Sequence, residues 1–166
     1  MPDHPAGSAS DRFGRHVRSR RSELDMTVRD VAREAGISPN TLVLIEKNAT
    51  SAQLDTIGRL AGALKIDPCA FFSDDCFPPP TRERLALLRR CVAENICSIR
   101  NSRGLSQRVL EHGADLPDRY VAKIEANAPN LTLAVVEKIA SRLSVAVVVL
   151  FHPIDLNGHH ATQTNA

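Results

Sequence analysis

Two clusters of arginine are the most concentrated charged groups in the chain. The first comprises Arg12, Arg15, Arg18, Arg20 and Arg21, and the second comprises Arg82, Arg84, Arg89 and Arg90. Guanidinium groups bind phosphate oxygens, so basic residues at helical spacing can mark a surface that faces nucleic acid. A solvated helix face explains either cluster equally well when that cluster is taken alone.

No constellation of residues in the sequence is typical of an enzyme or of a metal site. The four cysteines, Cys69, Cys76, Cys91 and Cys97, contain no C-x2-C pair and are too few and too clustered for a disulfide scaffold. The sequence also contains no nucleophile elbow, no P-loop and no paired catalytic carboxylates. We therefore expect a protein that is not an enzyme, that needs no metal or cofactor, and whose thiols are reduced and inert.

The composition is that of a folded protein with one or two domains. Of 166 residues, 43% are hydrophobic and 24% are charged, and the net charge is only +2. The longest apolar run, Val145–Phe151, is far shorter than the roughly 18 residues of a membrane span. The polar segment Met1–Ser10 has none of the apolar character of a secretory signal. We expect a cytoplasmic protein.

An internal repeat organises the chain. A shift of 79 residues aligns residues 17–72 with residues 96–151 without a gap and gives 12 identities in 56 positions. The identical pairs include Arg21/Arg100, Glu46/Glu125 and Phe72/Phe151. Apolar positions stay in phase along the whole alignment, so the chain consists of two copies of one small domain.

A short segment that disfavours a helix joins the two copies. It contains two aspartates and the consecutive prolines Pro78–Pro80, which favour an extended polyproline conformation. We therefore predict a first domain over residues 10–73, a linker over 74–80 and a second domain over 81–153. The polar tails at 1–9 and 154–166 are expected to be flexible.

Capping residues predict about five short helices in each copy. In the first copy Thr27 and Asp30 form the pattern of a capping box, Gly36 suits a left-handed turn, and Ser38 precedes Pro39 at the first position of a third helix. The predicted helices of this copy cover residues 10–23, 27–35, 38–47, 53–64 and 68–72. In the second copy they cover residues 82–102, 106–113, 117–125, 132–143 and 146–151.

Two short helices joined by a turn that contains glycine are typical of a helix-turn-helix. The stretches Ile96–Gln107, Arg119–Asn127 and Gly36–Lys47 resemble the Cro/cI-type helix-turn-helix family, which is lambda-repressor-like and is also called the xenobiotic-response-element family. The resemblance covers about 120 of the 166 residues. It implies an all-α fold with two tandem five-helix lambda-repressor-like domains, joined by the short Pro-rich linker.

The resemblance also assigns two ion pairs. In this family an arginine of the first helix pairs with a glutamate at the end of the third helix. The matching residues are Arg21 with Glu46, and Arg100 with Glu125. A bidentate bond of this kind holds two helices together, so these four residues are expected to be structural and not to read DNA.

Residues that read bases are expected near the N-terminus of the third helix, and the resemblance adds the first turn of the second helix. In the second copy these positions hold Gln107, Asp118, Arg119 and Lys123. Glutamine pairs with adenine, arginine and lysine pair with guanine, and Asp118 can accept from cytosine or orient Arg119. The alternative for this group is a solvated helix face.

The corresponding surface of the first copy is less polar. It holds Val28, Pro39, Asn40, Val43 and Leu44, of which only Asn40 can make a bidentate hydrogen bond to a base. Val43 and Leu44 can contact thymine methyl groups, or equally a protein partner.

Phosphate contacts need only hydroxyl, amide or cationic groups near helix N-termini. The candidates are Ser38, Lys47, Thr50, Ser51, Ser106, Arg108 and Asn130. Two positions of the second copy depart from the family pattern, because Glu111 and Asp115 stand where the first copy has Ala32 and Gly36. Both leave the detailed geometry of the second helix-turn-helix open.

Together these observations predict a transcriptional regulator that binds double-stranded DNA sequence-specifically, with repression as the preferred role. The alternative is a protein-interaction module, antitoxin-like or anti-activator in kind, with only residual DNA binding. A homodimer or a protein partner would then bind through Val43 and Leu44 or through Val145–Phe151.

Overall fold

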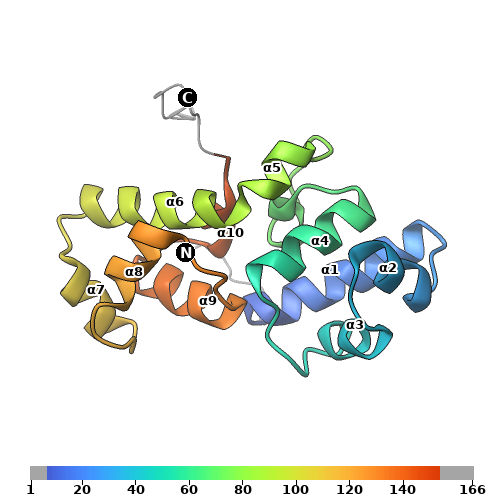
Figure 1. Ribbon diagram of the computed structural model, residues 1–166, viewed down its shortest axis with the longest axis horizontal. Helices are drawn as coiled ribbons and strands as arrows, with labels where there is room; N and C mark the ends of the chain where they lie inside the picture. The colour runs from blue at the N-terminus through green and yellow to red at the C-terminus, as the bar shows by residue number, and fades with distance from the viewer. Residues whose placement is uncertain (1–6, 154–166) are drawn as a thin grey trace.

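The computed structural model describes residues 7–153, and these form an all-helical protein with two similar halves (Figure 1). The first half contains α1 (Ala9–Glu23), α2 (Val28–Ala35), α3 (Pro39–Glu46), α4 (Leu54–Leu64) and the short 3-10 helix η1 (Pro68–Phe71). The remainder contains α5 (Arg82–Ala86), α6 (Leu88–Ser102), α7 (Gln107–Gly113), α8 (Tyr120–Asn127), α9 (Leu133–Arg142) and α10 (Val147–Phe151). The all-α prediction with two tandem copies is confirmed.

Helices α2 and α3 begin at the capping residues that the sequence identifies. Thr27 Oγ1 accepts a 3.2 Å hydrogen bond from the backbone N of Asp30, whose carboxylate accepts a 3.0 Å bond from the backbone N of Thr27. Ser38 and Ser106 cap α3 and α7 through their hydroxyl oxygens alone, which accept from the backbone N of Thr41 and of Val109. Helix α1 begins at Ala9, which is within the predicted tail, and residues 1–6 and 154–166 lie outside the described part of the chain.

The predicted helix over residues 82–102 is divided in two. Helix α5 ends at Ala86 and α6 begins at Leu88, while Thr81 caps α5 through a 3.1 Å bond from the backbone N of Arg84. Helix α5 packs against α4 of the first copy. The first helix after the linker, α5, thus packs against the first copy.

One hydrophobic core runs through both copies. Phenylalanines lie at its centre: the ring centroids of Phe13 and Phe71 are 4.8 Å apart, and those of Phe72 and Phe151 are 4.6 Å apart. Phe72 and Phe151 are equivalent residues of the repeat, so each copy contributes the same side chain to the contact. Within the apolar run Val145–Phe151, helix α10 therefore covers part of the core, and it also forms part of the contact between the copies.

Backbone hydrogen bonds between the copies also join equivalent positions. The backbone N of Leu54 donates to the carbonyl of Leu131 at 2.9 Å, and the backbone N of Leu133 donates to the carbonyl of Ala52 at 2.8 Å. Between them Gln53 and Thr132 form an isolated antiparallel bridge. A shift of 79 positions relates Leu54 to Leu133 and Ala52 to Leu131, so the two hydrogen bonds are equivalent, and Gln53 lies against its own equivalent Thr132. This is the contact pattern of a two-fold axis.

Two side-chain hydrogen bonds between the copies have the same symmetry. Asn130 Oδ1 accepts from the backbone N of Asp55 at 3.0 Å, and Ser51 Oγ accepts from the backbone N of Ala134 at 3.0 Å. Each copy thereby caps the fourth helix of the other copy. Helix α1 packs on α9 as its equivalent α6 packs on α4, so the two halves are arranged as a dimer within one chain (Figure 1).

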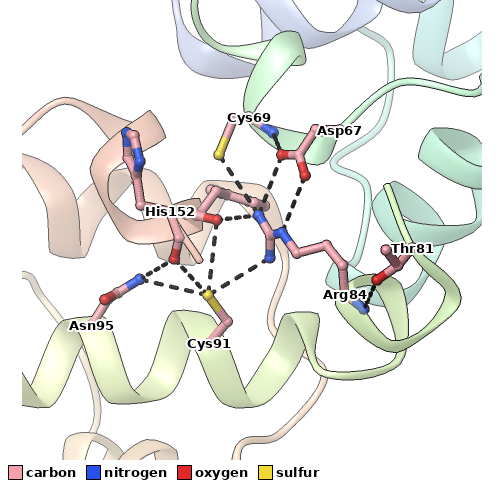
Figure 2. A network of polar contacts seen from close by, with 8 residues as sticks. Asp67, Cys69, Thr81, Arg84, Cys91, Asn95 and His152 are labelled. Carbon is pink, nitrogen blue, oxygen red and sulfur yellow. Dashed lines mark hydrogen bonds and ion pairs between the residues drawn. The ribbon is translucent and has the colours of Figure 1, made fainter. Parts of the chain in front are cut away.

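A buried arginine of α5 adds a contact without symmetry. Arg84 Nε donates to Asp67 Oδ2 at 3.1 Å (Figure 2). Arg84 Nη2 donates to the carbonyl oxygen of Phe151. Cys69 and Cys91 lie beside the same guanidinium group, and Cys91 donates to the carbonyl of His152. Burial, with the charge of Asp67, raises the pKa of the Cys69 thiol to about 12. Arg84 thus joins α5 to Asp67, near the end of the first copy, and to Phe151, at the end of the second copy.

Candidate nucleic-acid interface

The helix-turn-helix of the first copy is regular. Helix α2 ends at Ala35, and Gly36 adopts φ +63°, a conformation that favours glycine. Three residues later α3 begins with Pro39 at its first position, and Ser38 Oγ accepts a 3.0 Å bond from the backbone N of Thr41. Leu42 and Ile45 are buried, so α3 turns its opposite face to solvent.

The exposed face of α3 carries the residues that the sequence analysis assigned to DNA contact. Asn40 and Lys47 are exposed, Leu44 is 36% exposed, and Val43 is half-buried. Asn48 closes the helix with φ +54°, and the exposed Thr50 follows it. The surface is thus a mixture of one amide, two apolar side chains and one cation.

An ion pair fixes the position of α3. Arg21 donates from Nε and Nη2 to the two carboxylate oxygens of Glu46 at 2.7 and 3.1 Å, and from Nη1 to the carbonyl of Met26 at 3.1 Å. The hydrogen bond to Glu46 raises the pKa of Arg21 above its ordinary value. The guanidinium group therefore links α1, the turn before α2 and the end of α3.

The second copy contains the same arrangement. Arg100 donates to both carboxylate oxygens of Glu125 at 2.6 and 3.0 Å and to the carbonyl of Leu105 at 2.7 Å. Gln107 joins this group, since its Nε2 donates to Glu125 Oε2 at 2.7 Å. Burial opposes ionisation of Glu125, but the hydrogen bonds from Arg100 and Gln107 outweigh it and hold the pKa of Glu125 below its ordinary value. The amide that was expected to read bases therefore also supports the ion pair.

The turn of the second helix-turn-helix is longer than expected. The predicted helix over residues 117–125 begins instead at Tyr120, so six residues (114–119) separate α7 from α8 where three (36–38) separate α2 from α3. Asp115 adopts φ +52°, the left-handed conformation of its equivalent Gly36. Arg119 also has a positive φ of +61° and stands at the N-cap of α8.

Glu111 explains how α8 begins without the usual cap. Pro117 replaces the capping Ser38 of the first copy and offers no side-chain hydrogen-bond acceptor. The carboxylate of Glu111 is buried and accepts a 2.9 Å hydrogen bond from the backbone N of Val121. An acceptor on α7 thus satisfies a free N–H in the first turn of α8.

The exposed residues of α8, and of the turn that precedes it, differ in charge from those of α3. Asp118, Arg119 and Lys123 are all exposed. Of the expected phosphate contacts in this copy, Ser106 is exposed and caps α7, whereas Asn130 caps α4 and donates from Nδ2 to Gln53 Oε1 at 3.0 Å. The structure therefore places Asn130 in the contact between the copies.

Two functions of side chains were not anticipated from the sequence. The cap that Glu111 gives to α8, and the caps that Ser51 and Asn130 exchange, join residues on different helices. The absence of a capping side chain at Pro117 and at Gln53 is the signal that could have prompted a search for an acceptor elsewhere.

The described residues offer neither a metal site nor a membrane span. No three His, Cys, Asp or Glu side chains among residues 7–153 are placed to hold a metal ion. None of the helices in this part of the chain is both long and apolar enough to cross a membrane.

The comparisons with known proteins identify the family. A helix-turn-helix family model matches the chain twice, over residues 17–71 and 98–150, which together are more than half of its length. No curated protein and no solved structure matches the chain. The two matches coincide with the two copies of the repeat, and the chain belongs to the Cro/cI-type helix-turn-helix family of DNA-binding proteins.

Proposed function

We propose that this chain is a transcriptional repressor that binds double-stranded DNA sequence-specifically. The observation that carries the proposal is the pair of locked helix-turn-helix units, each held by a bidentate arginine–glutamate pair. In each unit the helix that follows the turn exposes polar or cationic side chains away from the core. Helices with this placement enter the major groove and contact base edges.

The exposed side chains divide into those that read bases and those that position the protein. Arg119 and Lys123 can donate hydrogen bonds to guanine, and the amide of Asn40 can pair with adenine. Lys47, Ser38, Thr50 and Ser106 lie near helix ends, where they would hold phosphate oxygens. A chain bound through both helices would cover the DNA between and around their sites. It would thereby exclude RNA polymerase from this DNA and repress transcription.

The experiment that tests this proposal is selection of binding sites from random duplex DNA with the full chain. An enriched motif is expected, and Arg119→Ala should reduce its affinity by about 1–3 kcal/mol and relax preference at one base pair. Arg90→Ala is the matched control, because Arg90 pairs with Glu94 of its own helix at 2.6 Å, as on a solvated helix face, so this substitution should leave the preference unchanged. Recovery of no motif would refute the proposal.

A second candidate function is a contact with another protein through α3. It is favoured by one observation, the exposure of Leu44 beside the half-buried Val43 on the helix that would otherwise face DNA. If this surface binds a protein, Leu44→Asp should abolish that complex while Arg119→Ala leaves it intact. If α3 reads DNA, both substitutions should weaken binding to the selected duplex.

A further inference from the structure

We infer that one copy of this chain, without a partner chain, occupies a complete operator made of two inverted half-sites that differ in sequence. The inference rests on the proposed function and adds the form of the DNA site and the stoichiometry. Three features of the structure carry it: the symmetry of the contact between the copies, the rigidity of that contact, and the difference between the exposed residues of α3 and α8.

The first step concerns symmetry. Gln53 faces its equivalent Thr132, and Phe72 faces its equivalent Phe151. Copies related by a simple translation would bring different residues together at the two sides of the contact, whereas a half-turn brings each position against its equivalent. Helices α3 and α8 are therefore related by a half-turn, and they lie in opposite halves of the elongated molecule (Figure 1).

This symmetry determines the direction of the half-sites. The two strands of a DNA duplex are related by two-fold axes perpendicular to the helix, and operator palindromes mirror the two-fold symmetry of the proteins that bind them. Two reading helices that are related by a half-turn, and that enter successive turns of the major groove, read the same direction of sequence on opposite strands. The half-sites must be inverted, and a direct repeat presents the second half-site in the wrong direction.

The second step concerns rigidity. The copies share one core, two backbone hydrogen bonds and the exchanged caps of Ser51 and Asn130. Arg84 adds ion pairing to Asp67 (Figure 2) and a hydrogen bond to Phe151 across the same boundary. The copies are thus held at one spacing. The surface that two separate domains would use to form a dimer is already buried inside the chain.

The third step concerns the difference between the half-sites. At equivalent positions the first copy has Asn40 and Leu44 where the second has Arg119 and Lys123. Because the turn before α8 is longer, Arg119 lies at the N-cap of α8, whereas its equivalent Asn40 lies within α3. Amide and apolar side chains favour A·T pairs, through adenine N6/N7 and the thymine methyl, whereas arginine and lysine favour guanine. One half-site should be richer in A·T pairs, and the other should contain guanine.

The test uses the selected duplex and three derivatives of it. In one derivative a single half-site is reversed to give a direct repeat, and in the other two one half-site is copied onto both sides to give perfect palindromes. Native mass spectrometry gives the number of chains per duplex, and titration gives the affinity. We expect one chain per duplex, a loss of about 100-fold on reversal, and weaker binding to both palindromes.

Variants then assign each half-site. Repeating the selection with Arg119→Ala should change only the half that contains guanine, and with Asn40→Ala only the other half, while Arg90→Ala should change neither. Two chains on the selected duplex, a preference for the direct repeat, or a palindrome bound as tightly as the selected site would overturn the inference but leave the proposed function standing. A pool without any enriched duplex would overturn both.

Discussion

The carboxylate of Glu111, on α7, accepts a 2.9 Å hydrogen bond from the backbone N of Val121 and so caps the start of α8. The equivalent of Glu111 in the first copy is Ala32, and there Ser38 performs the cap from its own helix. The two copies therefore solve the same problem with different residues. This relationship explains why a buried carboxylate is present where the family pattern has a small residue.

The first prediction follows from this cap. Glu111→Ala removes the acceptor and leaves the first turn of α8 with an unsatisfied N–H, so the free energy of unfolding should fall by about 1–2 kcal/mol in urea titrations. Glu111→Gln keeps an acceptor oxygen and should lose less. Glu34→Ala, at an exposed position of α2, is the control and should stay within about 0.5 kcal/mol of the parent. Equal losses for Glu111→Ala and Glu34→Ala would show that the cap contributes nothing.

The second prediction concerns pH. Because the pKa of Glu125 is lowered in the folded protein, the ionised carboxylate stabilises the fold fully above its unfolded pKa of about 4.3. This contribution disappears as the pH falls through the lowered, folded pKa. The difference in unfolding free energy between the parent and Glu125→Gln should therefore be large at neutral pH and shrink in strong acid. A difference that stays constant with pH would contradict this assignment.

The third prediction separates two roles for Asn130. As a cap for α4, its loss in Asn130→Ala should lower the free energy of unfolding by about 1 kcal/mol and leave the salt dependence of DNA binding unchanged. As a phosphate contact, its loss should instead weaken DNA binding and leave stability unchanged. Urea titration together with DNA binding at several salt concentrations distinguishes the two. Lys47→Ala provides the comparison, because loss of a cationic phosphate contact should reduce the salt slope by about one.

The fourth prediction concerns the buried pair of Arg84 and Asp67. Arg84→Met leaves the Asp67 carboxylate buried without its cation, which should cost about 3–5 kcal/mol. Asp67→Asn in the same chain should recover much of this loss, because the amide oxygen can still accept from the backbone N of Cys69. A double-mutant cycle measured by urea unfolding gives the coupling. Strictly additive losses would contradict a direct pair.

Local signals in the sequence predicted much of the fold correctly. Thr27, Ser38 and Gly36 act on neighbouring backbone groups, so their positions alone identify the ends of α2 and the start of α3. The gapless repeat predicted two copies, whereas it left open the turn at Asp115, which adopts a positive φ as its equivalent Gly36 does. The caps and turns depend only on residues a few positions apart, and the repeat depends only on a comparison of the sequence with itself.

The features that the sequence did not predict depend on distant contacts. The start of α8 at Tyr120 depends on Glu111 of another helix, and the break at Leu87 lets α5 pack on α4 of the first copy. The roles of Ser51 and Asn130 depend on the position of one copy against the other. No periodicity or capping pattern within one segment contains that information.

Specific DNA binding is the central claim, and the most direct measurement compares two duplexes. Affinity for the selected duplex and for a scrambled duplex of equal length is measured with the full chain at several salt concentrations. We expect at least about 1,000-fold tighter binding to the selected duplex at physiological salt, with affinity for both duplexes falling as salt rises. Equal affinity for the two duplexes would contradict it.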